Sequence, residues 1–201
     1  MSALAAIILA AGKGTRMRSN RAKVTFPIAG KPMVQRVVDT AIKINCDKIA
    51  VVVGYQKESV MACLEDDDRL EFIEQKEQLG TGHAVMITEP SFNGFSGDVF
   101  ILCGDVPLLS AETITSLYAE HTGTGAVCTV LTARLEDAGK YGRIIRDGQS
   151  KVRGIVEFKD ASPLQREIKE FNTGIYVFKA AELFAALKQT SNTNQQNEYY
   201  L

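Results

Sequence analysis

The residues best suited to chemistry lie in a glycine-rich, basic loop near the start of the chain. Gly12 and Gly14 come just after the apolar run of residues 4–9, and Arg16 follows them. Glycines let the backbone approach phosphate oxygens closely and point its N–H groups at them. Lys13, Arg16 and Lys23 would add positive charge in the same small volume. The loop therefore predicts a phosphate-binding turn that would suit a triphosphate.

Two common phosphate-binding motifs do not describe this loop. The P-loop pattern G-x-x-x-x-G-K-[ST] is absent from the chain. A dinucleotide-binding fingerprint would need a third glycine where Met17 stands, together with an acidic residue at the end of the second strand. When the loop is considered alone, an ordinary tight turn remains the alternative.

The elements that must position the loop alternate between strands and helices. Apolar runs predict buried strands at residues 4–9, 49–53 and 99–103, with further strands at 70–73, 126–133 and 173–178. Helical spacing predicts helices at residues 32–42, 57–64, 82–89, 111–121 and 180–188, and a short one before Phe171. Two short strands, 142–146 and 152–157, surround a hairpin signal at Asp147-Gly148. This order predicts a Rossmann-like, three-layer α/β/α fold with a mainly parallel mixed sheet, whose carboxyl edge would carry the loop.

Length, charge and cysteine content narrow the class of protein. The 201 residues fit one domain. The 23 basic and 24 acidic residues nearly cancel and form no basic run, which argues against binding to nucleic acid or to a membrane surface. The four scattered cysteines have no zinc-ligand spacing, and no segment has the pattern of a signal peptide or a membrane span. We therefore expect a cytoplasmic protein that acts on small molecules.

Motifs along nearly the whole chain resemble those of nucleotide-sugar pyrophosphorylases. The opening of the signature is carried by residues 9–17 (LAAGKGTRM), 23–24 (KV) and 30–33 (GKPM). Further matches follow in order at residues 78–84 (QLGTGHA), 104–109 (GDVPLL), 141–144 (YGRI), 155–161 (IVEFKDA), 171–176 (FNTGIY) and 198–201 (EYYL). Together they resemble the uridylyltransferase domain of bacterial bifunctional N-acetylglucosamine-1-phosphate uridylyltransferases. The resemblance implies a fold of the nucleotide-diphospho-sugar transferase type.

The reaction implied by this resemblance joins UTP to N-acetylglucosamine 1-phosphate. A phosphate oxygen of the sugar attacks the α-phosphate of UTP, which releases pyrophosphate and gives UDP-N-acetylglucosamine, a precursor of peptidoglycan and the cell wall. The family requires a metal ion, expected to be Mg²⁺. Such a displacement needs positioning and neutralisation of charge more than a side-chain nucleophile. Neither His83 nor His121 is expected to act as a general base, because the sugar phosphate already offers an ionised oxygen.

The resemblance also implies roles for particular residues. Arg16 and Lys23 match catalytic, phosphate-contacting positions, and Asp105 matches the ligand of Mg²⁺. The residues matching the nucleotide site are Leu9, Ala10, Ala11, Gly12, Gly14, Gln75, Gly80 and Thr81, of which the last three would read uracil. The residues matching the sugar site are Gly104, Gly142, Glu157 and Asn172. Without the resemblance, solvated surface charges and ordinary turn residues remain the alternatives for these positions.

The chain departs from the family pattern in two places. Ala22 stands where the family usually has proline, and Thr25-Phe26 replace leucine-histidine. A second metal ligand, an asparagine beyond residues 198–201, and a β-helix acetyltransferase domain are absent from the sequence. We therefore expect residues 1–201 to be a nucleotidyltransferase domain truncated at its C-terminal end, and a monomer or weak homo-oligomer. The alternatives are a nucleotidyltransferase for another sugar 1-phosphate and a catalytically weak nucleotide-sugar-binding protein.

Overall fold

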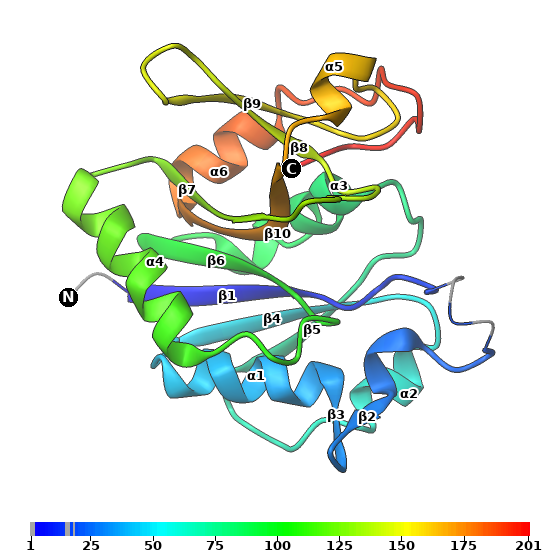
Figure 1. Ribbon diagram of the computed structural model, residues 1–201. Helices are drawn as coiled ribbons and strands as arrows, with labels where there is room; N and C mark the ends of the chain where they lie inside the picture. The colour runs from blue at the N-terminus through cyan, green and yellow to red at the C-terminus, as the bar shows by residue number, and fades with distance from the viewer. Residues whose placement is uncertain (1–2, 15–16, 18) are drawn as a thin grey trace.

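One mixed sheet of eight strands organises the molecule (Figure 1). The computed structural model describes residues 3–14, 17 and 19–201. The strands of the sheet are β1 (Ala3–Leu9), β4 (Lys48–Val53), β5 (Leu70–Glu74), β6 (Gly97–Cys103), β7 (Cys128–Arg134), β8 (Arg143–Arg146), β9 (Val152–Val156) and β10 (Glu170–Lys179). They lie in the order β5-β4-β1-β6-β10-β8-β9, with β7 paired to β10. A separate hairpin is formed by β2 (Pro27–Ile28) and β3 (Lys31–Pro32).

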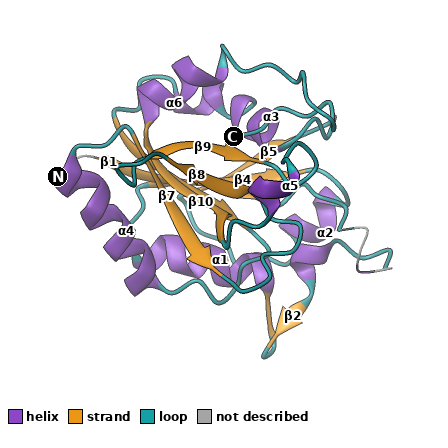
Figure 2. Ribbon diagram, turned by 45° about the horizontal axis from the view of Figure 1, so that its top comes forward, coloured by secondary structure: helices purple, strands orange, loops and turns teal. Residues whose placement is uncertain are grey.

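Helices cover both faces of the sheet, because the strands that form its centre are apolar on both sides. The helices are α1 (Met33–Lys43), α2 (Lys57–Met61), α3 (Thr81–Met86), α4 (Ala111–Thr124), α5 (Pro163–Arg166) and α6 (Ala180–Leu187), with short 3₁₀ turns η2 (Lys23–Thr25) and η3 (Glu89–Phe92). Alternate residues of β1 enter two separate cores: Ile8 packs with α1, α2 and α4, whereas Ile7 packs with α3, η3 and α6. Figure 2 shows these helices on the two sides of the strands. The predicted three-layer α/β/α architecture is confirmed.

The parallel half of the sheet gathers the carboxyl ends of its strands at one edge. Strands β5, β4, β1 and β6 are parallel neighbours, and Leu9 at the end of β1 is level with Val52 on one side and Cys103 on the other. The apolar runs of β1, β4 and β6 are buried, as expected for parallel strands covered on both faces, whereas β5 at the edge of the sheet is only half-buried. The loops that follow Leu9 and Cys103 therefore emerge side by side.

Strand β10 joins this parallel half to an antiparallel extension. It runs antiparallel to β6, β7 and β8, and β9 pairs in turn with β8. Its pairing with β7 is interrupted by a register shift between Asn172 and Ile175, where Gly174 adopts a positive φ of 77°. A left-handed backbone at such a bulge favours glycine. Ten residues long, the strand extends beyond its predicted range of 173–178 at both ends.

The boundaries of several elements differ from those predicted, for local reasons. Helix α1 begins at Met33, with Pro32 as its N-cap. Helix α3 begins at Thr81, with Gly80 as its N-cap, and ends at Met86 before the η3 turn. Helix α2 ends at Met61, three residues before the predicted end at Leu64. Residues 189–197 form the expected loop without a helix or strand. No helix among the described residues is long and apolar enough to cross a membrane.

Candidate active site

A cavity of about 400 Å³ opens at the carboxyl ends of β1 and β6. Its lining includes every residue predicted to contact the nucleotide, namely Leu9, Ala10, Ala11, Gly12, Gly14, Gln75, Gly80 and Thr81. Lys23 and Asp105, the predicted phosphate-contacting and metal-binding residues, lie in the same wall. Arg16, predicted to be catalytic, lies outside the described residues. The structure thus brings together ten residues from four separate segments of the sequence.

The loop after β1 is held in place by its backbone. Ala10 donates its N–H to the Val52 carbonyl at 2.9 Å, and the Ala11 carbonyl accepts from the Tyr55 N–H at 3.1 Å and from the Gln78 side-chain amide at 2.9 Å. Gly14 adopts a φ of 63°, and a Cβ there would lie 2.6 Å from the Cβ of Lys23. Glycine at this position therefore allows the loop to pass directly against Lys23, whose ammonium group lies in the cavity wall.

Lys23 and Asp105 form an ion pair within the cavity. The Nζ atom lies 2.5 Å from Oδ2, and the two side chains are 30% and 36% exposed. Lys23 belongs to the η2 turn, and Asp105 follows β6. Gly104 positions this segment, because its N–H donates to the Leu9 carbonyl at 3.0 Å and a Cβ there would lie 3.0 Å from the same oxygen. Gly104 lines neither this cavity nor its neighbour, so its observed role is close backbone packing.

The residues around Lys23 that depart from the family pattern form their own set of contacts. The Ala22 N–H donates to Oε1 of Gln56 at 3.0 Å, a bond that proline could not make. The buried Thr25 hydroxyl donates to the Ala22 carbonyl at 2.8 Å and accepts from Nε of Arg21 at 2.8 Å. These bonds fix the η2 turn through side chains, with Ala22 standing where the resemblance predicted proline.

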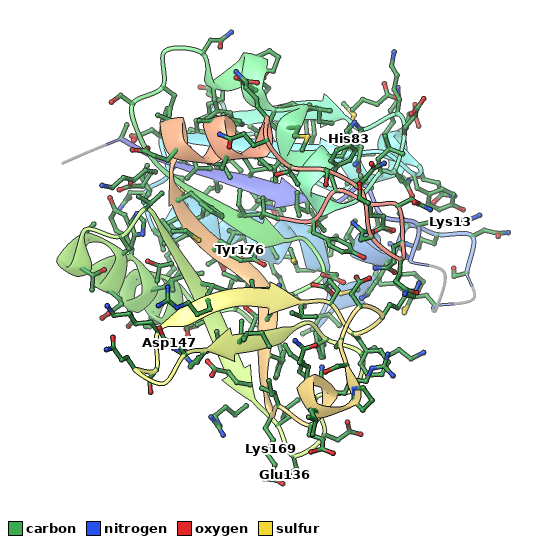
Figure 3. The ribbon with its side chains drawn as sticks, turned by 90° about the horizontal axis from the view of Figure 1, so that it is seen from above. Lys13, His83, Glu136, Asp147, Lys169 and Tyr176 are labelled. Atoms are coloured by element: carbon green, nitrogen blue, oxygen red, sulfur yellow. The ribbon has the colours of Figure 1, made fainter. Side chains whose placement is uncertain are left out.

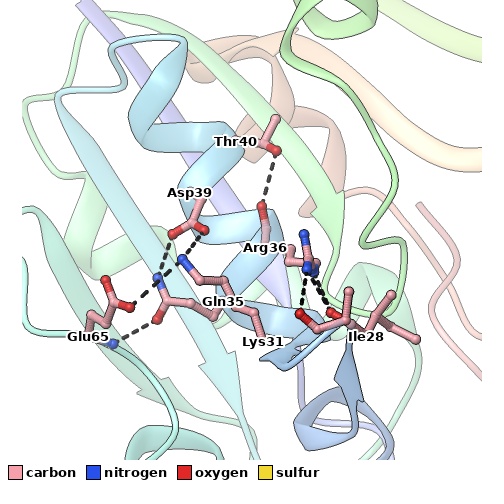
Figure 4. Close-up of polar contacts among 8 residues, drawn as sticks. Ile28, Lys31, Gln35, Arg36, Asp39, Thr40 and Glu65 are labelled. Carbon is pink, nitrogen blue, oxygen red and sulfur yellow. Dashed lines mark hydrogen bonds and ion pairs between the residues drawn. The ribbon is translucent and has the colours of Figure 1, made fainter.

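The hairpin after the η2 turn is tied to α1 by charged side chains (Figure 4). Arg36 donates to the Ile28 carbonyl through both Nε and a terminal nitrogen, at 2.9 and 2.7 Å. Lys31 pairs with Asp39 at 2.7 Å, and hydrogen bonding to that carboxylate raises the pKa of Lys31. Gln35 also donates to Asp39, at 2.7 Å. The GKPM part of the motif therefore supports the site without lining its cavity.

One corner of the cavity is built from Gln75 and the start of α3. Gln75 follows β5 and is only 5% exposed. Its Nε2 atom lies 3.2 Å from the Gly80 carbonyl oxygen and 3.1 Å from Nδ1 of His83. The amide predicted to read uracil is therefore anchored at its nitrogen end.

The last residues of the described chain pack against this corner. The Gly82 N–H donates to the Tyr199 carbonyl at 2.8 Å, and the Tyr199 N–H donates to the Leu79 carbonyl at 2.7 Å. A Cβ on Gly80 would lie 2.5 Å from the Tyr199 oxygen, and a Cβ on Gly82 would lie 2.7 Å from that of Tyr200. The end of the chain lies beside α3 in Figures 1 and 2. The glycines of the QLGTGHA motif thus have a structural reason that the sequence did not reveal.

A second cavity of about 170 Å³ adjoins the first. The two share Leu9, Thr81, Cys103 and Glu198 in their walls. The smaller cavity is also lined by Glu157, Asn172, Gly174, Tyr176, Gln196, Tyr200 and Leu201. Two of the predicted sugar-binding residues, Glu157 and Asn172, therefore lie together. Gly142 lies behind them, because its carbonyl accepts the Asn172 N–H at 2.9 Å and a Cβ there would lie 2.6 Å from Oε1 of Glu157.

The polar groups of the smaller cavity are connected through Asn172. Its Nδ2 donates to the Tyr176 hydroxyl at 2.6 Å, while its Oδ1 accepts the Gly174 N–H at 2.9 Å. Burial raises the pKa of the Tyr176 hydroxyl. Burial also raises the pKa of the Glu157 carboxyl, with smaller contributions from Asp160 and Glu198. These donors and acceptors suit a ligand that carries hydroxyl groups.

Several cavity residues were not assigned from the sequence. Among them, Gln78, Tyr176, Glu198 and Tyr200 lie inside matched motifs, whereas Cys103 and Gln196 lie outside them. Figure 3 labels His83 on α3 and Tyr176 on β10, and it shows Lys13 extending outward at the edge of the molecule. His121, in contrast, is a core residue whose Nδ1 lies 2.9 Å from the Thr129 hydroxyl oxygen. For Gln78, Tyr176, Glu198 and Tyr200, membership of a matched motif was therefore the available sequence signal of a place in the site.

Comparison with known proteins identifies the family of this chain. Residues 5–200 match the family model described as nucleotidyl transferase. The chain belongs to the nucleotidyl transferase family. Two relatives, each named bifunctional protein GlmU, come from Exiguobacterium sibiricum (52% identical over 98% of this chain and 43% of the relative) and from Syntrophotalea carbinolica (53% identical over 98% and 42%). The chain thus spans less than half the length of the curated relatives that it matches.

Solved structures of other nucleotidyltransferases share this fold. A UDP-glucose pyrophosphorylase complexed with UDP-glucose superimposes on the whole chain and on 84% of its own length, with a TM-score of 0.78. The apo form of a UDP-glucose pyrophosphorylase gives a TM-score of 0.76. Both are 21% identical to this chain, so they establish the fold alone. The predicted nucleotidyltransferase fold is confirmed.

Proposed function

We propose that this chain transfers a uridylyl group from UTP to N-acetylglucosamine 1-phosphate, releasing pyrophosphate and giving UDP-N-acetylglucosamine. The observation that carries the proposal is the pair of adjoining cavities, which share Leu9, Thr81, Cys103 and Glu198 and have the Lys23–Asp105 ion pair in the wall of the larger one. A nucleotide in the larger cavity and a sugar in the smaller one would have their phosphates at this junction. Family membership and the similarity to proteins named GlmU support the same reaction.

The chemistry requires two phosphates to meet while their negative charge is neutralised. A phosphate oxygen of the sugar 1-phosphate attacks the α-phosphorus of UTP, and the bond to the β-phosphate oxygen breaks, so that pyrophosphate carries away the electron pair. Lys23 would stabilise charge on the α-phosphate, because its ammonium lies in the wall of the nucleotide cavity. Charge stabilisation of this kind supplies most of the catalysis in phosphoryl and nucleotidyl transfer.

The Asp105 carboxylate in the larger cavity fits magnesium, which takes oxygen ligands and keeps several waters when substrate phosphates complete its coordination. Asp105 already holds a cation, since the Lys23 ammonium lies 2.5 Å from its Oδ2. The described residues contain no group of three His, Cys, Asp or Glu side chains arranged as a metal site. Asp105 would therefore hold Mg²⁺ together with the phosphates, and the ion would supply charge neutralisation there.

A coupled assay of pyrophosphate release tests this function. The wild-type chain should release pyrophosphate only when UTP, N-acetylglucosamine 1-phosphate and Mg²⁺ are all present. Asp105→Ala should lower kcat/KM by about 100-fold or more, whereas Asp68→Ala, at an exposed turn position before β5, should leave it unchanged. Wild-type turnover at background under every combination would reject the proposal, and full activity of Asp105→Ala would reject the metal role.

The same assay separates the proposed sugar from its alternatives. Glucose 1-phosphate and galactose 1-phosphate lack the acetamido group and should be poorer substrates. A faster reaction with either sugar would assign the chain to another nucleotidyltransferase activity. UDP-N-acetylglucosamine that raises the melting temperature without any turnover would instead indicate a nucleotide-sugar-binding protein.

A further inference from the structure

The orientation of the Gln75 amide is determined by the Gly80 carbonyl, and Nδ1 of His83 adds a second bond to the same nitrogen. The amide nitrogen, Nε2, lies 3.2 Å from the Gly80 carbonyl oxygen, and a carbonyl oxygen can only accept a hydrogen bond. The nitrogen end of the amide must therefore face Gly80. The same nitrogen lies 3.1 Å from Nδ1 of His83. Because the amide nitrogen can only donate, Nδ1 must accept, and the neutral His83 ring carries its hydrogen on Nε2.

These two bonds leave one group of Gln75 for a ligand. Both N–H groups of the amide donate to acceptors inside the protein. The amide oxygen, Oε1, accepts a hydrogen bond from none of the described residues. Gln75 lines the larger cavity although it is only 5% exposed. The side chain therefore offers the cavity a fixed acceptor. Rotating the amide by half a turn would place Oε1 against the Gly80 carbonyl oxygen, which can only accept, and would break the bond to Nδ1 unless the His83 ring moved its hydrogen to that nitrogen. Such a rotation is therefore unfavourable.

A fixed acceptor distinguishes the two pyrimidine bases found in ribonucleotides. Uracil carries a hydrogen on N3 and can donate it to Oε1 of Gln75. Cytosine has a lone pair on N3, which would face the same oxygen without a hydrogen between them. A site built to receive a donor rejects the analogue that lacks it, because its own buried polar group is then left unpaired.

We propose that His83 is a positioning residue that sets the preference of this cavity for uracil over cytosine by holding Gln75 with its oxygen toward the base. The inference rests on the proposed function in one respect, namely that the base of the nucleotide lies beside Gln75. His83 touches the base only through Gln75. Removal of its acceptor leaves the Gly80 carbonyl as the single restraint, so the amide can turn and donate to cytosine.

The surroundings of His83 keep its ring in register with Gln75. His83 is the third residue of α3, and the preceding Gly82 N–H is bonded to the Tyr199 carbonyl at 2.8 Å. The Tyr199 ring lies beside the His83 ring, with centroids 6.4 Å apart and planes inclined at 36°. The end of the described chain thus supports His83, the residue that orients the Gln75 amide toward the base.

Equilibrium binding of UDP and CDP tests the inference without requiring turnover. The ratio of their dissociation constants should fall by about fivefold in His83→Leu, the equilibrium factor of one neutral hydrogen bond. His83→Asn should restore most of the ratio, because its amide oxygen is bonded to Cγ as Nδ1 is and can accept at the same place. In the Gln75→Leu background, His83→Leu should change the ratio no further.

The outcomes separate this inference from the proposed function. An unchanged ratio in His83→Leu, or equal loss in His83→Leu and His83→Asn, would overturn the positioning role. Circular dichroism and thermal melting of each variant identify a folding defect. If His83→Leu is misfolded, the ratio of the UDP and CDP dissociation constants in His83→Asn is compared with wild type, and a lower ratio in His83→Asn would overturn the positioning role. Wild-type turnover of UTP is measured separately, so absence of catalysis with an intact UDP preference would reject the reaction and keep the role of His83.

Discussion

Replacing Gly82 by alanine should destabilise the protein, although helix propensity alone favours the opposite. Gly82 is buried in α3, and alanine in a helix is ordinarily more stable than glycine by up to about 1 kcal/mol. A Cβ here would lie 2.7 Å from the Tyr200 carbonyl oxygen and 3.0 Å from that of Tyr199. Such distances are too short for two backbone oxygens to accommodate, so the end of the chain must move away.

The magnitude follows from the bonds that this movement breaks. The Gly82 N–H to Tyr199 carbonyl bond and the Tyr199 N–H to Leu79 carbonyl bond, at 2.8 and 2.7 Å, would both be lost. At about 1 kcal/mol for each bond, the loss is about 2 kcal/mol. The gain in helix propensity offsets about half of it. The free energy of unfolding should therefore fall by about 1 kcal/mol, which lowers Tm by about 2–4 °C in a chain of this length.

Gly123 provides a matched control for this prediction. It lies on the exposed side of α4, and a Cβ on it would meet nothing within 4 Å. Gly123→Ala should raise the free energy of unfolding by up to about 1 kcal/mol through propensity alone. The two variants change the same residue type in the same direction, so the difference in their effects isolates the contact of Gly82 with the chain end.

Urea unfolding followed by circular dichroism measures both variants, and calorimetry measures their affinity for UDP-N-acetylglucosamine. Gly82→Ala should also bind the nucleotide-sugar more weakly, since the displaced segment carries Glu198, which lines both cavities. Equal stabilisation by the two substitutions, with unchanged affinity, would refute the packing argument. Weaker binding without a change in stability would show that the segment contributes to the site alone.

Three further predictions concern the smaller cavity and the sheet around it. Tyr176→Phe removes the hydroxyl that accepts from Asn172 and should raise KM for the sugar phosphate by about fivefold while leaving KM for UTP unchanged. Steady-state kinetics with each substrate varied in turn measure the two values, and an equal rise in both would contradict a role in the smaller cavity. Burial raises the pKa of Glu157, so ionisation of this carboxyl opposes folding. In urea titrations at several pH values, Glu157→Gln should gain stability relative to wild type as the pH rises above 4.5. A difference in stability that stays constant with pH would contradict this. Hydrogen bonding from Arg146 lowers the pKa of the buried Glu170, and the Arg146 side chain is 38% exposed, so Arg146→Met should cost about 1 kcal/mol at neutral pH. The loss should shrink as acid protonates Glu170, and a loss independent of pH would argue against the pairing.

Local patterns were sufficient to predict the parts of the fold that depend on neighbouring residues. The buried strands β1, β4 and β6 are apolar on both faces, and that composition is visible in any short window of the sequence. The glycines after β1 were likewise recognisable as a turn, and Gly14 there adopts a positive φ of 63°. The order of strands was not predictable in the same way, because β10 pairs with β6, β7 and β8 through contacts between distant residues.

Some structural contacts of site residues could not be predicted because their partners are remote in the sequence. Gly104 was predicted to bind the sugar, and its close packing against the end of β1 depends on the distant Leu9. Gly82 appeared only as part of a motif, and the chain end that explains it lies more than a hundred residues later. Gln75 could be assigned from the resemblance, but the partners that fix its orientation required the folded arrangement of α3.

The position of β10 has a consequence for synthesis of the chain. Until residues 170–179 leave the ribosome, β6 presents an unpaired edge whose side chains are almost entirely apolar. Exposed apolar edges recruit other strands and promote aggregation. A nascent chain that pauses between β6 and β10 should therefore depend on chaperones more than one that pauses after Lys179. Codon changes that slow translation in that interval would be expected to lower the soluble yield without altering a single residue of the active site.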